Sequence, residues 1–164
     1  MACTIFGQGE TMQTQPQTQQ RGRRRGGRRE PDLWVLLARI EWGIRPPGVL
    51  SARQQPWLAA QLRDLERMLD ARFAAEEDAS PLYRDVPIQE PRLAPHVETL
   101  RRDHPTLRGW LHRLVQVAGL PPDAVLLATL TAEVRDLVRA IRRHERSEEE
   151  TLQDAVGTDI PATD

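Results

Sequence analysis

The segment with the clearest chemical potential is 142–150, RRHERSEEE, in which a single histidine precedes a run of carboxylates. His144 and Glu148 stand four residues apart, so on a helix their side chains lie on one face and can reach the same ion. Mixed imidazole and carboxylate ligands suit iron, manganese or zinc. The spacing therefore indicates part of a metal site, provided that this face of the helix turns inward.

The apolar spacing of the same segment predicts that His144 and Glu148 do face inward. Apolar residues recur at steps of three and four at Leu127, Leu130, Val134, Leu137 and Ile141. The next positions of this series are 144 and 148, and Leu152 then resumes it. By the same count Glu145 falls off the inward face. His144 and Glu148 are therefore expected where leucine would otherwise pack.

Two further segments direct ionisable groups inward in the same way. The series Leu58, Leu62, Leu65 and Leu69 continues with Arg72 and Glu76, and His104 stands between Leu100 and Leu107. Burying an unpaired carboxylate costs several kcal/mol, so such groups are expected to have partners. The sequence therefore predicts one buried polar cluster, made of Arg72, Glu76, His104, His144 and Glu148.

Simpler interpretations exist for each residue alone. A single histidine on an apolar face is most often a hydrogen-bonded core residue, and acidic runs such as EEDAS and SEEE usually face solvent. Agreement among three segments favours the cluster. His96 and His112 lie eight residues on either side of His104, which rotates their direction by about 80° on a helix. We therefore expect these two histidines in solvent.

Four helical segments are expected to position the cluster. The apolar spacing and the prolines predict a short helix within 31–44, a second over 55–78 and a loop over 78–91. A third helix precedes the break GLPPD at 119–123, and a last helix runs to about Val156. Because no segment alternates with period two, the predicted fold is all-α, an up-down four-helix bundle with a short first helix.

One geometric conflict accompanies this prediction. His104 lies about 16 residues before the middle of the 119–123 break and His144 about 23 residues after it. Their heights along the bundle would differ by roughly 10 Å, unless the last helix begins near residue 127 or 128. Pro105 adds an expected kink next to His104.

Composition limits the other possibilities. The 164 residues carry a net charge of −1 and one cysteine, Cys3, which excludes an intramolecular disulfide and a cysteine zinc site. We expect a disordered Gln/Arg-rich tail at 1–30, a helical domain at 31–157 and a C-terminal tail at 158–164. Arg21–Arg29 is the one stretch that indicates nucleic-acid binding, and it does so by positive charge alone. We prefer to interpret this stretch as part of a solvated tail.

The chain has no apolar run of the ~20 residues that span a bilayer, and its first residues do not resemble a signal peptide. We therefore expect a cytoplasmic protein without a membrane partner, and leave a protein partner and the oligomeric state open. Ser147 has no base nearby other than His144, and nothing resembles a nucleophile elbow or a phosphate loop. We expect no enzymatic activity, and Tyr83 receives no role.

Three stretches together resemble a known family. These are LDARFAAEEDASPLY at 69–83, PRLAPHVETLRRDHPTLRGWL at 91–111 and IRRHERSEEETLQDAVGTDI at 141–160. Their order and spacing resemble the hemerythrin-like, HHE cation-binding bundles of bacteria. The resemblance implies a helical bundle that binds non-haem iron for dioxygen binding, iron handling or redox sensing. The ligands that it implies here are Glu76, His104, His144 and Glu148, with Glu149 as the substitute for Glu148.

Three histidines of the family pattern are absent. Arg72 and Arg108 stand at two of these positions, and no histidine precedes His96 to serve the first helix. Arginine cannot ligate a metal, but Arg72 lies one turn from Glu76 and can pair with it. With Glu76 and Glu148 ionised, a charge of −1 remains, which one protonated histidine or a cation can balance.

Two hypotheses follow from this reduced set of ligands. The first is a hemerythrin-like cation-binding protein that senses iron, oxygen or redox state with a mononuclear or vestigial site, holding non-haem iron or another divalent metal. The second is a metal-free helical interaction module in which ion pairs of Arg72 replace the metal. A two-iron oxygen carrier is not expected.

Overall fold

The computed structural model describes residues 32–44 and 50–157, and all regular secondary structure within these ranges is helical. The predicted all-α fold is confirmed for these residues. The tails predicted at 1–30 and 158–164 lie outside the described residues. In the described ranges, no helix combines the length and the apolar character that crossing a membrane requires.

Among the described residues, three helices are long: α2 (Gln55–Ala79), α5 (Ala94–Ala118) and α6 (Ala124–Gly157). The first helix, α1 (Leu33–Gly43), is shorter. Between α2 and α5 lie α3 (Pro81–Arg84), α4 (Val86–Gln89) and the 3-10 turn η1 (Pro91–Leu93). The prediction of a loop over 78–91 was therefore wrong. Each short element has a proline in its first turn, where a fixed φ favours a helix start and no hydrogen bond is lost.

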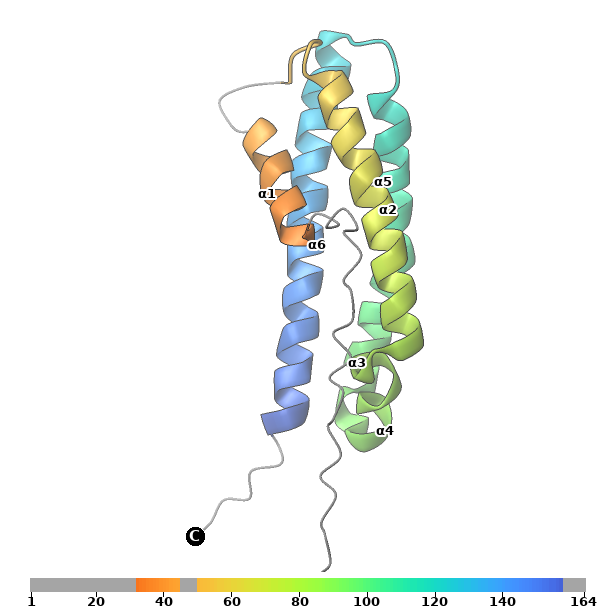
Figure 1. Ribbon diagram of the computed structural model, residues 1–164. Coiled ribbons are helices and arrows are strands. Elements are labelled where there is room, and N and C mark those ends of the chain that lie inside the picture. Colours follow the sequence, from red (N-terminus) through yellow and green to blue (C-terminus); the bar gives the residue numbers. More distant parts are fainter. Residues whose placement is uncertain (1–31, 45–49, 158–164) are drawn as a thin grey trace, which may run out of the picture. The chain divides into compact units, whose positions relative to one another are not determined.

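The long helices α2, α5 and α6 lie side by side, and α1 packs against α2 and α6 over only part of their length (Figure 1). The leucine series predicted to face inward does so: Leu58, Leu62, Leu65 and Leu69 of α2 are fully buried. Each buried leucine contributes roughly 1.5–3 kcal/mol relative to an exposed one. This apolar contact between the long helices fixes which faces of α2, α5 and α6 meet.

The expected difference in height between His104 and His144 does not keep them apart. α6 begins at Ala124, not near residue 127 or 128, yet the two imidazole rings lie only 4.9 Å apart. Two features explain this contact. α6 starts beyond the end of α5 and runs in the opposite direction (Figure 1), and side chains tilt toward the N-terminus of their own helix, so the two histidines lean toward each other. α5 continues through Pro105 as one helix.

Candidate metal centre

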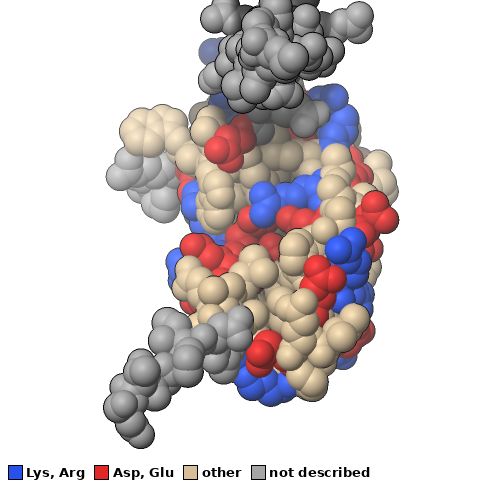
Figure 2. All heavy atoms as spheres, turned by 60° about the horizontal axis from the view of Figure 1, so that its bottom comes forward, with Lys and Arg blue, Asp and Glu red and all other residues tan. Residues whose placement is uncertain are grey.

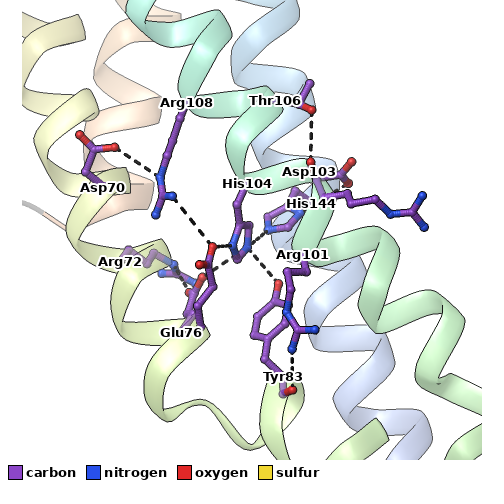
Figure 3. A network of polar contacts seen from close by, with 12 residues as sticks. Asp70, Arg72, Glu76, Tyr83, Arg101, Asp103, His104, Thr106, Arg108 and His144 are labelled. Carbon is purple, nitrogen blue, oxygen red and sulfur yellow. Dashed lines mark hydrogen bonds and ion pairs between the residues drawn. The ribbon is translucent and has the colours of Figure 1, made fainter.

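His104 lies at the centre of a buried polar cluster (Figure 3). Its ring stacks on Phe73 of α2, with centroids 4.0 Å apart and planes at 4°. Its Nδ1 atom lies 2.7 Å from Oε1 of Glu77. Because an ionised carboxylate can only accept, the proton belongs on Nδ1 and the lone pair of Nε2 points into the cluster. Glu77 therefore sets the tautomer of His104.

His144 of α6 presents its Nε2 atom to the same centre. The two Nε2 atoms of His104 and His144 are 3.1 Å apart. Oε1 of Glu148 lies 3.4 Å from Nε2 of His144 and 3.8 Å from Nε2 of His104. Ligands at about 2.0–2.1 Å from one ion are roughly 3–3.5 Å from each other. The two contacts of His144 have this spacing, and the distance from Glu148 to His104 is slightly longer, so the three atoms can surround a single ion after a small shift of Glu148. Behind His144, Oδ2 of Asp103 lies 3.7 Å from Nδ1.

Tyr83 of α3 brings a fourth polar atom to this centre. Its hydroxyl oxygen lies 3.0 Å from Nε2 of His104, and its O–H donates to Oε1 of Glu148. Burial, together with the hydrogen bond to Glu148, raises the pKa of Tyr83 far above its usual value. The phenol therefore keeps its proton when no metal is bound. We call His104, His144, Glu148 and Tyr83 the imidazole half of the cluster.

A second group, the guanidinium half, consists of Arg72, Glu76 and Glu145. Nε of Arg72 lies 2.6 Å from Oε1 of Glu76, and an amino nitrogen of Arg72 lies 2.5 Å from Oε2 of Glu145. The expectation that Glu145 falls off the inward face was wrong, since its side chain is only 4% exposed. Position 145 is four residues after Ile141 and three before Glu148, and a buried helical stripe is wide enough to include it.

The carboxylates of the cluster outnumber its one guanidinium. Glu76, Glu145 and Glu148 against Arg72 leave a charge of −2 when all are ionised, so Glu145 doubles the deficit that the sequence indicates. Burial raises the pKa of Glu145 to about 7, and burial, with repulsion from Glu148, raises the pKa of Glu76. The cluster therefore lacks positive charge.

In the imidazole half, the lack of positive charge affects the pKa values differently. Burial alone would raise the pKa of Glu148, but its contacts with His104, His144 and Tyr83 outweigh burial and hold the value at about 2. Burial likewise opposes protonation of His144, but its contact with Glu148 prevails and raises the pKa of His144. Glu148 is thus the carboxylate that stays charged, and it attracts a proton or a metal ion to the imidazoles.

Several buried polar atoms of the cluster have no hydrogen-bond partner among the described residues. They include Oε2 of Glu76, Oε1 of Glu145 and Nδ1 of His144. Such atoms are rare in folded proteins and indicate a missing water or ion. Two groups of ligand atoms each lie within 4.8 Å of one another, and they are His104 with His144 and Glu148, and Glu76 with Glu145 and Glu148. The donor set therefore fits a cation.

The cluster can be reached from two sides. A cavity of about 290 Å³ is lined by the guanidinium half and by Trp34 of α1. A second cavity of about 280 Å³, between α5 and α6, is lined by His144, Asp103 and Trp110. These openings give a metal ion an entry path. Figure 2 shows acidic and basic side chains mixed on the face that it presents.

The structure brings together all five residues of the predicted cluster: Arg72, Glu76, His104, His144 and Glu148. Glu149, the substitute ligand, is exposed, as are His96 and His112. Arg108 pairs with Asp70 (Figure 3) and lies 4.0 Å from Oε1 of Glu77, the oxygen that contacts His104.

Sequence reasoning missed Glu77, Tyr83 and Glu145. Glu77 directly follows a residue of the predicted cluster, and Tyr83 is the only tyrosine of the chain, five residues after Asp78 at the end of the acidic run. Glu145 lies four residues after Ile141 and three before Glu148. This spacing would have indicated burial if the inward face had been taken as a stripe rather than a single line of positions.

Comparison with known families agrees with this geometry. The family model described as hemerythrin HHE cation binding domain matches residues 49–156, which is well over half of the chain. Searches of curated proteins and of solved structures found no match. The matched residues include both halves of the polar cluster and all of α2 and α5. The chain belongs to the hemerythrin HHE cation-binding domain family.

Proposed function

We propose that this protein binds one divalent transition-metal ion, iron foremost, in the imidazole half of the cluster. His104, His144 and Glu148 would be the ligands, with Glu76 at the margin, where its Oε2 lies 3.9 Å from Nε2 of His104. In this proposal α1, α2, α5 and α6 form the up-down four-helix bundle of the family.

The observation that carries the proposal is the pair of Nε2 atoms facing each other at 3.1 Å. The proton of His104 is held on Nδ1 by Glu77, so its Nε2 lone pair needs a hydrogen-bond donor or a cation as partner. A metal ion is such a partner, and a carboxylate behind a ligand histidine is the usual way to orient it. Asp103 stands in the corresponding place behind His144.

The charge of the cluster supports the same conclusion. Its deficit of two positive charges matches a divalent ion, which would make the cluster neutral. The raised pKa values of Glu145, Glu76 and His144 mean that these groups bind protons more readily than in water when no ion is present. Metal binding would then displace protons from the cluster.

Arg72 is the reason for proposing one ion rather than two. Its guanidinium lies between the carboxylates of Glu76 and Glu145, which are the groups that would otherwise hold a second ion. A fixed positive charge at this place repels a second cation, and arginine offers no lone pair. We therefore propose sensing or handling of iron in the cytoplasm, without enzymatic turnover.

A metal-free interaction module is the second candidate function. The observation that favours it is the ion pair network of Arg72, with contacts of 2.6 and 2.5 Å to two carboxylates. In this state His144 would carry a proton on Nε2 and donate it to His104. The protein would then act through its surface alone.

Metal titration of chelator-treated protein distinguishes the two functions. We expect Fe²⁺, added without oxygen, to bind at one ion per chain, and the double variant His104→Gln/His144→Gln to lose this binding. The matched control is His96→Gln/His112→Gln, which removes two exposed imidazoles and should bind normally. Fewer than about 0.2 ions per wild-type chain, with Mn²⁺ and Zn²⁺ also failing to bind, would reject the metal function.

A further inference from the structure

We propose that Tyr83 coordinates the bound ion through its phenolate oxygen and thereby makes the site selective for ferric iron. This inference rests on the metal function proposed above and adds an anionic oxygen to its ligands. It assigns a role to the one aromatic residue that the sequence pattern leaves without one.

The geometry places the hydroxyl of Tyr83 among the ligand atoms. Its oxygen contacts two of the three proposed ligand atoms, Nε2 of His104 at 3.0 Å and Oε1 of Glu148. The oxygen of Tyr83 is therefore about as close to Nε2 of His104 as Nε2 of His144 is, at 3.0 Å and 3.1 Å respectively. Donor atoms that surround one ion have this mutual spacing of about 3 Å.

The surrounding structure holds Tyr83 firmly in this place. Ser80 directly precedes α3 and caps it, because its side chain accepts from the backbone N–H of Leu82. Arg101 donates to the backbone carbonyl of Tyr83 at 2.8 Å, and its guanidinium lies 5.7 Å from the centroid of the tyrosine ring. The tyrosine is buried. A buried phenol needs only one hydrogen-bond partner, so contact with two metal-ligating groups exceeds what packing requires.

The charge balance explains why the ferric ion is favoured. With Fe²⁺ and a neutral phenol, the deficit of two charges is filled and the cluster is neutral. With Fe³⁺ the cluster would carry +1, unless the phenol loses its proton to solvent and the oxygen binds iron. Bound cations are the largest local charges and favour such deprotonation. No electron is transferred in this step when Fe³⁺ is supplied directly.

The simpler interpretation is that Tyr83 only donates a hydrogen bond to Glu148. Under that interpretation its removal would lower stability, but it would leave the colour and the metal preference of the loaded protein unchanged. Spectroscopy therefore separates the two roles.

The chain makes the spectroscopic test unusually clear, because Tyr83 is its only tyrosine. Chelator-treated full-length protein is loaded with Fe³⁺ from ferric citrate, and visible absorption and resonance Raman spectra are recorded. We expect a phenolate-to-iron charge-transfer band whose enhanced ring modes shift when the protein carries ring-deuterated tyrosine. Tyr83→Phe should bind one Fe²⁺ per chain but lose the band and the preference for Fe³⁺ over Fe²⁺.

Thr131→Val is the matched control, because it removes a buried hydroxyl that bonds to the backbone of Leu50 and Leu127, outside the polar cluster. It should keep the band. Iron bound by wild-type protein with no deuterium-sensitive band would overturn the role of Tyr83 and leave the metal function standing. Absence of any metal binding would overturn both. If Tyr83→Phe fails to fold, the deuterium shift in wild-type protein decides alone.

Discussion

The two halves of the polar cluster solve the same electrostatic problem in different ways. The imidazole half offers lone pairs, with Nε2 of His104 and of His144 facing each other beside Glu148. The guanidinium half contains its own cation, since Arg72 lies between Glu76 and Glu145. A buried pair of carboxylates can thus be neutralised by an arginine of the same chain. The neighbouring imidazoles and Glu148 then remain available to bind a metal ion that can exchange.

The largest effect should come from removing the built-in cation. We expect Arg72→Leu to lower the free energy of unfolding of the metal-free protein by about 3 kcal/mol, because Glu76 and Glu145 would stay buried without a partner. This is the low end of the range for a broken buried pair, since the side chain of Arg72 is 36% exposed. Urea denaturation with chelator present measures the change.

Arg67→Leu provides the control for Arg72→Leu, because Arg67 is on the same helix but 79% exposed. Its loss should change the free energy of unfolding by less than about 0.5 kcal/mol. Equal effects of the two substitutions would mean that the guanidinium half is not a buried ion-pair network.

A pH-dependent effect of similar or smaller size should come from Glu145. Its pKa of about 7 in the folded protein lies above the 4.5 of an ordinary glutamate, so its protonated form stabilises the fold. This contribution is complete below pH 4.5 and is lost as the pH rises to 7, for a total of at most roughly 3 kcal/mol.

Glu145→Gln should therefore flatten the pH dependence of unfolding of the metal-free protein between pH 4.5 and 7. Urea denaturation at a series of pH values compares it with Glu149→Gln, a change at an exposed position of the same helix. The same slope in wild type and in Glu145→Gln would contradict the burial of this charge.

Glu77, whose carboxylate accepts from Nδ1–H of His104, should affect metal affinity. Glu77→Gln should weaken metal binding by about 10–100-fold, because the amide no longer sets the tautomer of His104 by accepting from Nδ1–H. Competition with a chromophoric chelator measures the affinity. The control is Asp78→Asn, which changes the next residue of the chain and should leave the metal affinity unaltered. Unchanged affinity in Glu77→Gln would show that His104 is not a ligand oriented in this way.

The smallest effect on metal affinity should come from Asp103, the carboxylate near Nδ1 of His144. Asp103 lies 3.7 Å from Nδ1 of His144, and its side chain is half exposed. We expect Asp103→Asn to weaken metal binding less than Glu77→Gln, and by no more than about tenfold. The same chelator competition applies. A larger loss from Asp103→Asn than from Glu77→Gln would reverse the ranking of the two histidines.

Much of this arrangement was predictable from residue spacing. The three-and-four steps of leucine decide which face of a helix is buried, and they place Arg72, His104 and His144 on the inward faces of their helices. The same steps gave the all-α class and the approximate extent of the long helices.

The remaining features depend on geometry that periodicity does not contain. Glu145 was missed because a single line along the helix is narrower than the stripe that is buried. Tyr83 was missed because its place is set by the proline-started turns of α3 and α4, and not by a repeat. The contact of His104 with His144 needed the offset of α5 and α6 and the tilt of their side chains.

We expect one ion in the imidazole half of the cluster and none in the guanidinium half. Anomalous diffraction from crystals of the iron-loaded protein, recorded on both sides of the iron absorption edge, locates the metal directly. We predict a single peak within bonding distance of Nε2 of His104 and Nε2 of His144. A peak between Glu76 and Glu145, two peaks, or no peak in protein shown to contain iron would contradict it.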